Sequence, residues 1–134
     1  MRYTPVHQRL FINSRKRFAR RIQPNSIAVF NSNDIMPTSA DGTMPFYQQT
    51  DLLYLSGIDQ EETILLLFPD AKEEQYREVL FIKETSEEIA IWEGHKFTKE
   101  EARELSGIPT VLWLSQFESV FNSLVFQAQQ IYLN

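Results

Sequence analysis

Residues 63–68 read Thr-Ile-Leu-Leu-Leu-Phe and contain the longest continuous apolar run of the chain. Pro69 and Asp70 end this run. A short run with no polar alternation is typical of a strand that is buried on both faces of a sheet. Other short apolar runs predict further strands at Ser26–Phe30, Val79–Lys83, Ile89–Trp92, Val111–Leu114 and Gln130–Asn134.

Helical patterns lie between these strands. The first expected helix runs from Pro5 to about Arg21, after an N-cap at Thr4. A second begins at the capping box Thr98/Glu101 and ends at Gly107. A third begins at the capping box Ser115/Glu118 and has a core-facing stripe of Phe117, Val120, Phe121, Leu124 and Val125. Strands that alternate with helices favour an α/β domain. We expect a mixed β-sheet of about five or six strands, flanked by helices on both faces.

Composition bounds the class of protein. The 134 residues are 43% hydrophobic, enough to fill the core of one ordinary domain, and no internal boundary is visible. Cysteine is absent, which excludes thiol catalysis and thiolate metal sites and suits a reducing compartment; we expect a cytoplasmic protein. No secretory signal and no apolar run of roughly 18–20 residues is present, so no membrane partner is expected. The net charge of −5 argues against nucleic-acid binding.

The residue types that carry chemistry form no convincing constellation. His7 and His95 are far apart and lack metal-ligand spacing, and the acidic groups at 59–62, 70–74 and 100–104 are best interpreted as solvated surface. No glycine-rich phosphate loop occurs. We therefore expect no catalytic residue and no metal ligand in this chain.

The basic run Arg15, Lys16, Arg17, Arg20 and Arg21 allows two interpretations. It is either a wet helix face, salt-bridged to neighbouring domains, or a docking face for an acidic partner or a polyanion. The first interpretation is the one we favour from the sequence.

Two segments stand out, Ser39–Gly57 and Ile89–Lys96. In the first, Asp51 is expected to cap a short helix that carries Leu52, Leu53 and Leu55 inward, with Gly57 closing it. The second is expected to deliver Trp92 into a tight turn at Gly94. Structural interpretations remain open for both: a loop tied to the core by its aromatic residues, and a tryptophan buried at the end of a strand.

In sequence order, these segments resemble the N-terminal domain of the aminopeptidase P family, within the creatinase/prolidase superfamily. The resemblance rests on Ser39-Ala-Asp41, on Pro45-Phe-Tyr-Gln-Gln-Thr-Asp-Leu-Leu-Tyr-Leu-Ser-Gly-Ile58, on Ile91-Trp-Glu-Gly94 and on the charged first helix. It extends from about Arg15 to Asn134. Tyr47, Gln49, Asp51, Tyr54 and Gly57 would be structural members of the signature. Gln48 stands where the family usually has Arg, and Leu52 where Phe is usual.

The resemblance implies a larger metallopeptidase, of which residues 1–134 are a single N-terminal domain, truncated before its last helix. A C-terminal catalytic "pita-bread" domain, absent from these residues, would hold two divalent metals, usually manganese, and would remove the residue before proline. The front domain would shape the cleft and the subunit contacts, with Asp41, Trp92 and Gly94 facing the substrate. Its partners would be its own catalytic domain, other copies of the chain, and peptides with proline second.

Two alternatives stay open. The chain would also suit the front domain of a prolidase or a creatinase, or a non-enzymatic relative that binds peptides or proteins, because a fold alone does not define a function.

Overall fold

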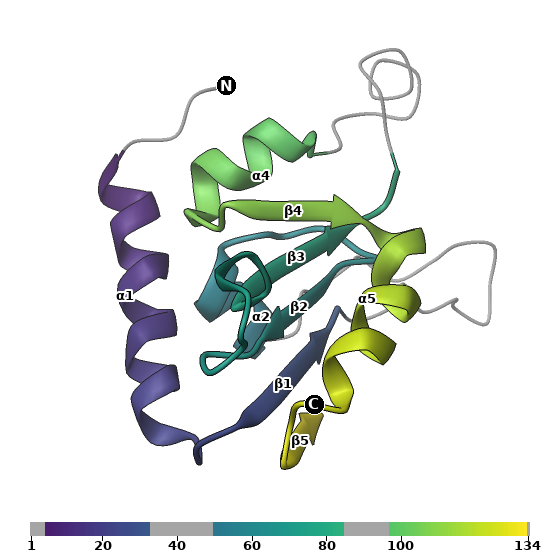
Figure 1. Cartoon of the computed structure of the whole chain (residues 1–134). Coiled ribbons are helices and arrows are strands. Elements are labelled where there is room, and N and C mark those ends of the chain that lie inside the picture. Colours follow the sequence, from purple (N-terminus) through teal and green to yellow (C-terminus); the bar gives the residue numbers. More distant parts are fainter. Residues whose placement is uncertain (1–4, 33–49, 85–96, 134) are drawn as a thin grey trace, which may run out of the picture.

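A computed structural model describes residues 5–32, 50–84 and 97–133, and side chains from residue 8 onward. In these ranges five strands form one sheet in the order β4-β3-β2-β1-β5 (Figure 1). The strands are β1 Ser26–Asn31, β2 Ile64–Leu67, β3 Glu78–Ile82, β4 Thr110–Trp113 and β5 Gln130–Leu133. Each matches a predicted apolar run; the strand predicted at Ile89–Trp92 lies outside the described residues.

The apolar run at 63–68 supplies the central strand, as its composition predicts. β2 pairs antiparallel with both β1 and β3, whereas β5 adds to β1 and β4 adds to β3 in parallel. The sheet is therefore mixed. Leu65, Leu66 and Leu67 are at most 2% exposed, because helices cover both faces at this strand.

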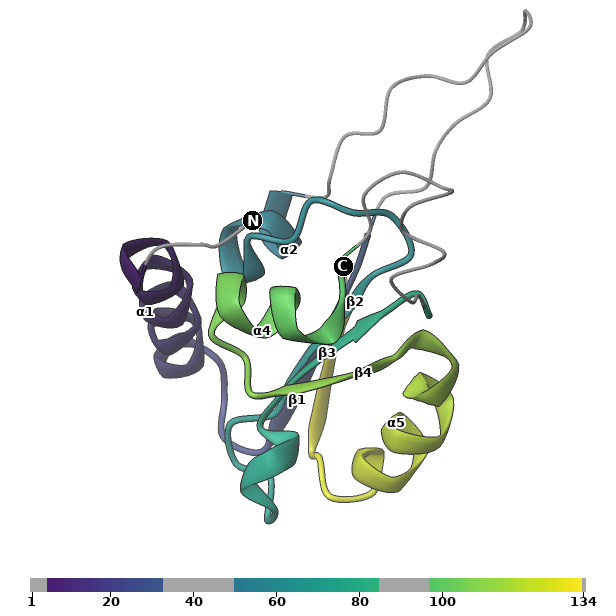
Figure 2. The same ribbon diagram turned by 90° about the horizontal axis from the view of Figure 1, so that it is seen from above.

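The two faces of the sheet carry different helices (Figure 2). Helices α1 Pro5–Arg21, α2 Thr50–Ser56 and α4 Lys99–Ser106 cover one face, and α5 Phe117–Val125 covers the other. Alternate residues of the central strands divide between two core clusters, as the pleat requires. Leu65, Leu67, Leu80 and Ile82 belong to the cluster with α2 and α4, and Leu66, Val79 and Phe81 to the cluster with α5. The predicted α/β class, with helices on both faces, is confirmed.

Helix α5 packs through Phe117, Val120, Phe121 and Leu124 of its predicted stripe, without Val125, and it begins differently from the prediction. The ring of Phe117 meets Phe81 edge-on at 5.1 Å, and Leu124 is buried. The capping box Ser115/Glu118 is wrong: a 3-10 turn, Leu114–Gln116, precedes the helix and takes up Ser115. Gln116 is the N-cap, with no side-chain capping bond; its side chain instead accepts a hydrogen bond from the Trp113 amide at 2.9 Å.

Helix α4 follows its prediction. Thr98 and Glu101 form both bonds of a capping box, and Gly107 ends the helix with φ of 75°. Helix α2 follows in part. Gly57 ends it, also with positive φ, but the helix begins at Thr50, so that Asp51 lies inside the first turn.

Leu53 was expected to face inward in α2, and this is wrong because the side chain is 39% exposed. A helix this short buries only one narrow stripe of side chains in the core, and here the stripe is Leu52, Leu55 and Ser56.

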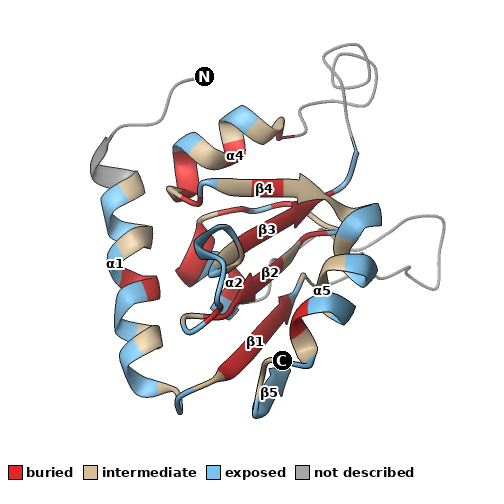
Figure 3. Cartoon of the chain, in the orientation of Figure 1, coloured by how far each residue is buried: buried red, intermediate tan, exposed pale blue. Residues whose placement is uncertain are grey.

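Burial falls off toward the β5 edge of the sheet (Figure 3). All four residues of β5 are exposed, and Ile131 and Leu133 are 47% and 70% exposed. A second 3-10 turn, Glu74–Tyr76, joins β2 to β3. No helix in the described ranges has the length and apolar character needed to cross a membrane.

Candidate functional site

One end of the sheet is the candidate site, because the two segments that the sequence singles out, Ser39–Gly57 and Ile89–Lys96, follow strands that end there. β1 ends at Asn31 and β3 at Ile82, and both strands run antiparallel to β2 between them. Their carboxyl ends therefore lie at the same edge of the sheet. Segments 33–49 and 85–96 follow directly after these two ends.

Polar contacts fix the described residues at that edge. The Ser32 amide donates to the Thr63 carbonyl at 2.9 Å, and the Thr63 amide donates back to the Ser32 hydroxyl at 3.0 Å. Gln60, only 5% exposed, accepts from the Phe97 amide at 2.8 Å. Ser32, just before segment 33–49, and Phe97, just after segment 85–96, are thus both hydrogen-bonded to the same short loop, 60–63.

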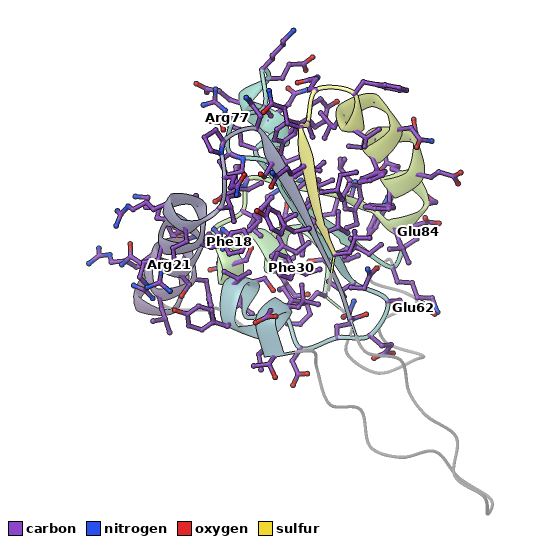
Figure 4. The ribbon with its side chains drawn as sticks, turned by 90° about the horizontal axis from the view of Figure 1, so that it is seen from below. Phe18, Arg21, Phe30, Glu62, Arg77 and Glu84 are labelled. Atoms are coloured by element: carbon purple, nitrogen blue, oxygen red, sulfur yellow. The ribbon has the colours of Figure 1, made fainter. Side chains whose placement is uncertain are left out.

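A hollow of about 340 Å³ lies at this edge. Its lining comes from the ends of β1, β2 and β4, and consists of Asn31, Ser32, Glu62, Thr63, Ile64 and Leu114. Glu62 adopts φ of 53° and lies 3.4 Å from the Lys83 ammonium. Figure 4 shows Glu62 and Glu84 toward this end of the sheet and Arg77 toward the other. The hollow offers polar binding atoms.

The residues predicted to face a substrate, Asp41, Trp92 and Gly94, lie outside the described residues, as do the signature residues Tyr47 and Gln49. Their roles stay predictions. Among the residues that the structure does describe, no three His, Asp or Glu side chains gather as a metal site.

The signature residues that the structure does describe hold α2 against α1. An added Cβ at Gly57 would lie 2.3 Å from the Phe11 ring, so only glycine lets these helices approach so closely. The Tyr54 hydroxyl accepts a hydrogen bond from Arg17 at 3.0 Å. This bond and a second one from Ser14 lower the pKa of the phenol. Asp51 is exposed in the first turn of α2, where a negative charge favours the helix dipole.

Sequence reasoning missed a buried ion pair beneath α1. Arg15, placed in the wet basic run, is only 1% exposed. Its Nε lies 3.1 Å from Glu78 Oε2, and its Nη1 donates to the Leu55 carbonyl at 2.8 Å. Burial lowers the pKa of the guanidinium, and the Glu78 carboxylate opposes that shift.

A signal for this burial was present in the spacing. Arg15 lies four residues after Phe11 and three before Phe18, on the apolar stripe of the helix. The buried Nη2 atom has no hydrogen-bond partner among the described residues, so the guanidinium is only partly satisfied.

The sequence matches a family of known proteins over most of its length. The family described as "Aminopeptidase P, N-terminal domain" matches residues 11–132. The chain belongs to this family.

Individual relatives agree. The chain is 24% identical over 127 residues to the Xaa-Pro aminopeptidase of Escherichia coli K12, covering 95% of the chain and 29% of that protein. A Bacillus anthracis structure assigned as an aminopeptidase P is similar at TM-score 0.83 and 26% identity, with coverage of 95% and 30%. The Pseudomonas aeruginosa aminopeptidase PepP has the same fold at TM-score 0.83 and 22% identity, with coverage of 99% and 29%. The chain thus spans about three tenths of the length of these relatives.

Proposed function

We propose that the chain is the non-catalytic N-terminal domain of a metal-dependent Xaa-Pro aminopeptidase. The family match and the E. coli relative support this reading over a prolidase or a creatinase. So does the share of the relatives that the chain spans, which leaves most of their length for a catalytic domain. The domain's role is to shape the substrate cleft and the contacts between subunits.

One observation carries the role at the cleft. Segments 33–49 and 85–96, which hold Asp41, Trp92 and Gly94, begin at the same edge of the sheet. Strands buried on both sides make a rigid support, and functional residues often follow directly after the ends of such strands. Trp92 then offers a flat apolar wall to a peptide, and Asp41 holds a cationic group.

The metals of this proposal belong to the catalytic domain. The described residues do not fit a dinuclear site, since they bring no three ligand-type side chains together. Among the structural neighbours, one is described as zinc-substituted E. coli aminopeptidase P in complex with product. We propose that manganese, held by the catalytic polypeptide, serves this protein, and that the front domain leaves the metal chemistry untouched.

The test compares two proteins: the 134-residue chain, and the product of the complete reading frame that contains it. After dialysis against manganese, we expect retained metal and cleavage of Xaa-Pro peptides only in the second. Stoichiometric manganese on the 134-residue chain would overturn the proposal. Cleavage restricted to Xaa-Pro dipeptides would instead indicate a prolidase, and peptide binding without metal or cleavage a non-enzymatic relative.

A further inference from the structure

Positive charge is concentrated in one helix of an acidic chain. Helix α1 contains six basic residues and no acidic one, whereas the whole chain has 13 Lys and Arg against 18 Asp and Glu. Arg15 is buried beneath the helix, but Lys16, Arg17, Arg20 and Arg21 are exposed. These four exposed cations make no ion pair with a carboxylate in the part of the chain that the structure describes.

A groove of about 240 Å³ runs between this basic face and helix α2. We call it the α1/α2 groove; its lining consists of Ser14, Arg17, Phe18, Arg21, Phe30, Asp51, Tyr54 and Leu55. Phe18 and Phe30 pack edge-on with ring centroids 5.5 Å apart, between α1 and β1, with Arg21 on α1 beside them (Figure 4). The groove thus combines aromatic walls with two guanidinium groups.

The larger hollow on the other side of α1 makes a useful contrast. It measures about 480 Å³ and shares Phe18, but two of its three cations already have carboxylate partners, and Lys16 is the third. Arg15 pairs with Glu78, and Arg77 lies 3.8 Å from Glu74. In the α1/α2 groove the lining has two guanidinium groups, those of Arg17 and Arg21, and one carboxylate, that of Asp51. Arg17 and Arg21 also act electrostatically on Tyr54 and contribute to the lowering of its pKa, as expected in a positive field.

From this geometry we propose that the α1/α2 groove is a docking site for an acidic peptide segment that carries one aromatic or large aliphatic side chain. The apolar side chain enters between Phe18, Phe30 and Leu55, and the flanking carboxylates meet Arg17 and Arg21. A guanidinium binds a carboxylate through two parallel hydrogen bonds, which makes arginine the suitable residue at such a rim.

The volume of the groove and the net charge of the chain favour a peptide over other anions. The groove is smaller than the roughly 300–1,000 Å³ of small-molecule sites, so it accepts about one side chain. A nucleic acid requires a broad positive face, and the net charge of −5 on the chain repels a polyanion. A short segment with a few carboxylates stays close to the positive charges of α1 and meets less of that repulsion.

The test uses fluorescently labelled peptides Glu-Glu-X-Glu-Glu, with X as Phe, Leu or Ala, titrated onto the chain by anisotropy at low ionic strength. We expect saturable binding of the Phe or Leu peptide that weakens as salt is added. The Ala peptide and a Lys-Lys-Phe-Lys-Lys peptide are expected to bind at least about tenfold more weakly.

The deciding variant is Arg17→Gln/Arg21→Gln, and the control of equal charge is Lys72→Gln/Lys83→Gln, two exposed cations outside the groove. The arginine variant is expected to weaken binding of the Phe peptide about tenfold, and the control to leave it unchanged, with circular dichroism showing intact folding in both. Equal binding by the wild type and the arginine variant overturns the proposal. So does the absence of saturable binding by every peptide, tighter binding of an oligonucleotide than of the peptides, or self-association through α1 in place of peptide binding.

Discussion

Helices α2 and α4 end on the same four residues, Leu-Ser-Gly-Ile, at 55–58 and at 105–108. Both glycines take positive φ, 76° and 75°. In both helices the serine hydroxyl donates to the carbonyl four residues earlier, at 2.7 and 2.6 Å, and accepts from the isoleucine amide at 3.1 Å. Both helix ends then pack against α1. The same local sequence therefore produces the same local structure twice.

The two ends differ in what α1 presents to them. Over Gly57 lies the ring of Phe11, 2.3 Å from the position of an added Cβ, whereas over Gly107 lie the side chains of Ile12 and Gln8, at 2.6 and 2.8 Å. The overlap is therefore larger at Gly57 and involves a rigid ring. At the end of α2 the Leu55 carbonyl is bound by buried Arg15, whereas at the end of α4 the Glu104 carbonyl receives an exposed, longer bond of 3.3 Å from Gln8. The two ends share a local motif, but the contacts with α1 should make the α2 end less tolerant of substitution than the α4 end.

The largest expected effect comes from Gly57→Ala compared with Gly107→Ala. Both place alanine in the left-handed region, at a cost of about 1–2 kcal/mol in the free energy of unfolding. At Gly57 the added Cβ also meets the Phe11 ring at 2.3 Å, so overpacking of about 1–3 kcal/mol is added. Chemical denaturation should therefore show a loss of about 2–5 kcal/mol at Gly57 and a smaller loss, about 1–2 kcal/mol, at Gly107. Equal losses would mean that the context of α1 does not distinguish the two ends.

Arg15→Met and Gln8→Ala compare the side-chain hydrogen bonds to the carbonyls at the two helix ends, those of Leu55 and Glu104. The first variant leaves the buried Leu55 carbonyl unsatisfied and removes the partner of Glu78, which is only partly screened at 33% exposure. We expect a loss of about 2–3 kcal/mol, against less than about 0.5 kcal/mol for the exposed Gln8 bond. Adding Glu78→Gln to Arg15→Met should recover part of the loss. An Arg15→Met variant as stable as the wild type would contradict the role given to this ion pair.

Ser56→Ala and Ser106→Ala should, in contrast, be equal. Each removes a buried hydroxyl and leaves the amide of the following isoleucine without its acceptor, so each should cost about 1–2 kcal/mol. Thermal unfolding of the two variants side by side measures this. A difference larger than about 1 kcal/mol would show that the two serines contribute unequally to stability although their hydrogen bonds are the same.

Much of this fold could be predicted because short sequence patterns determine many of its helices and strands. The run at 63–68 predicts the central strand, and the spacing of Thr98, Glu101 and Gly107 predicts α4 from end to end. Strand order could not be predicted, because it depends on pairings between residues far apart in sequence.

The errors have the same origin. Arg15 looks solvent-exposed until α2 and β3 supply a carbonyl and a carboxylate for it. Ser115 looks like a cap until a 3-10 turn takes it up. The predicted residues at the cleft lie outside the described ranges, so what the structure supplies is the sheet edge from which their segments begin.

The central proposal, that this edge carries a substrate wall, is tested most directly by Trp92→Ala in the proposed full-length aminopeptidase. The readout is kcat/KM on an Xaa-Pro dipeptide and on a pentapeptide, together with the melting temperature. Trp113→Ala is the matched control, because Trp113 packs against the core and its loss should lower stability and affect both substrates alike.

We predict that Trp92→Ala lowers kcat/KM on the pentapeptide about tenfold or more, and changes the dipeptide value, the metal content and the melting temperature little. Equal losses on both substrates with a lowered melting temperature, as expected for Trp113→Ala, would contradict the claim and identify Trp92 as a core residue.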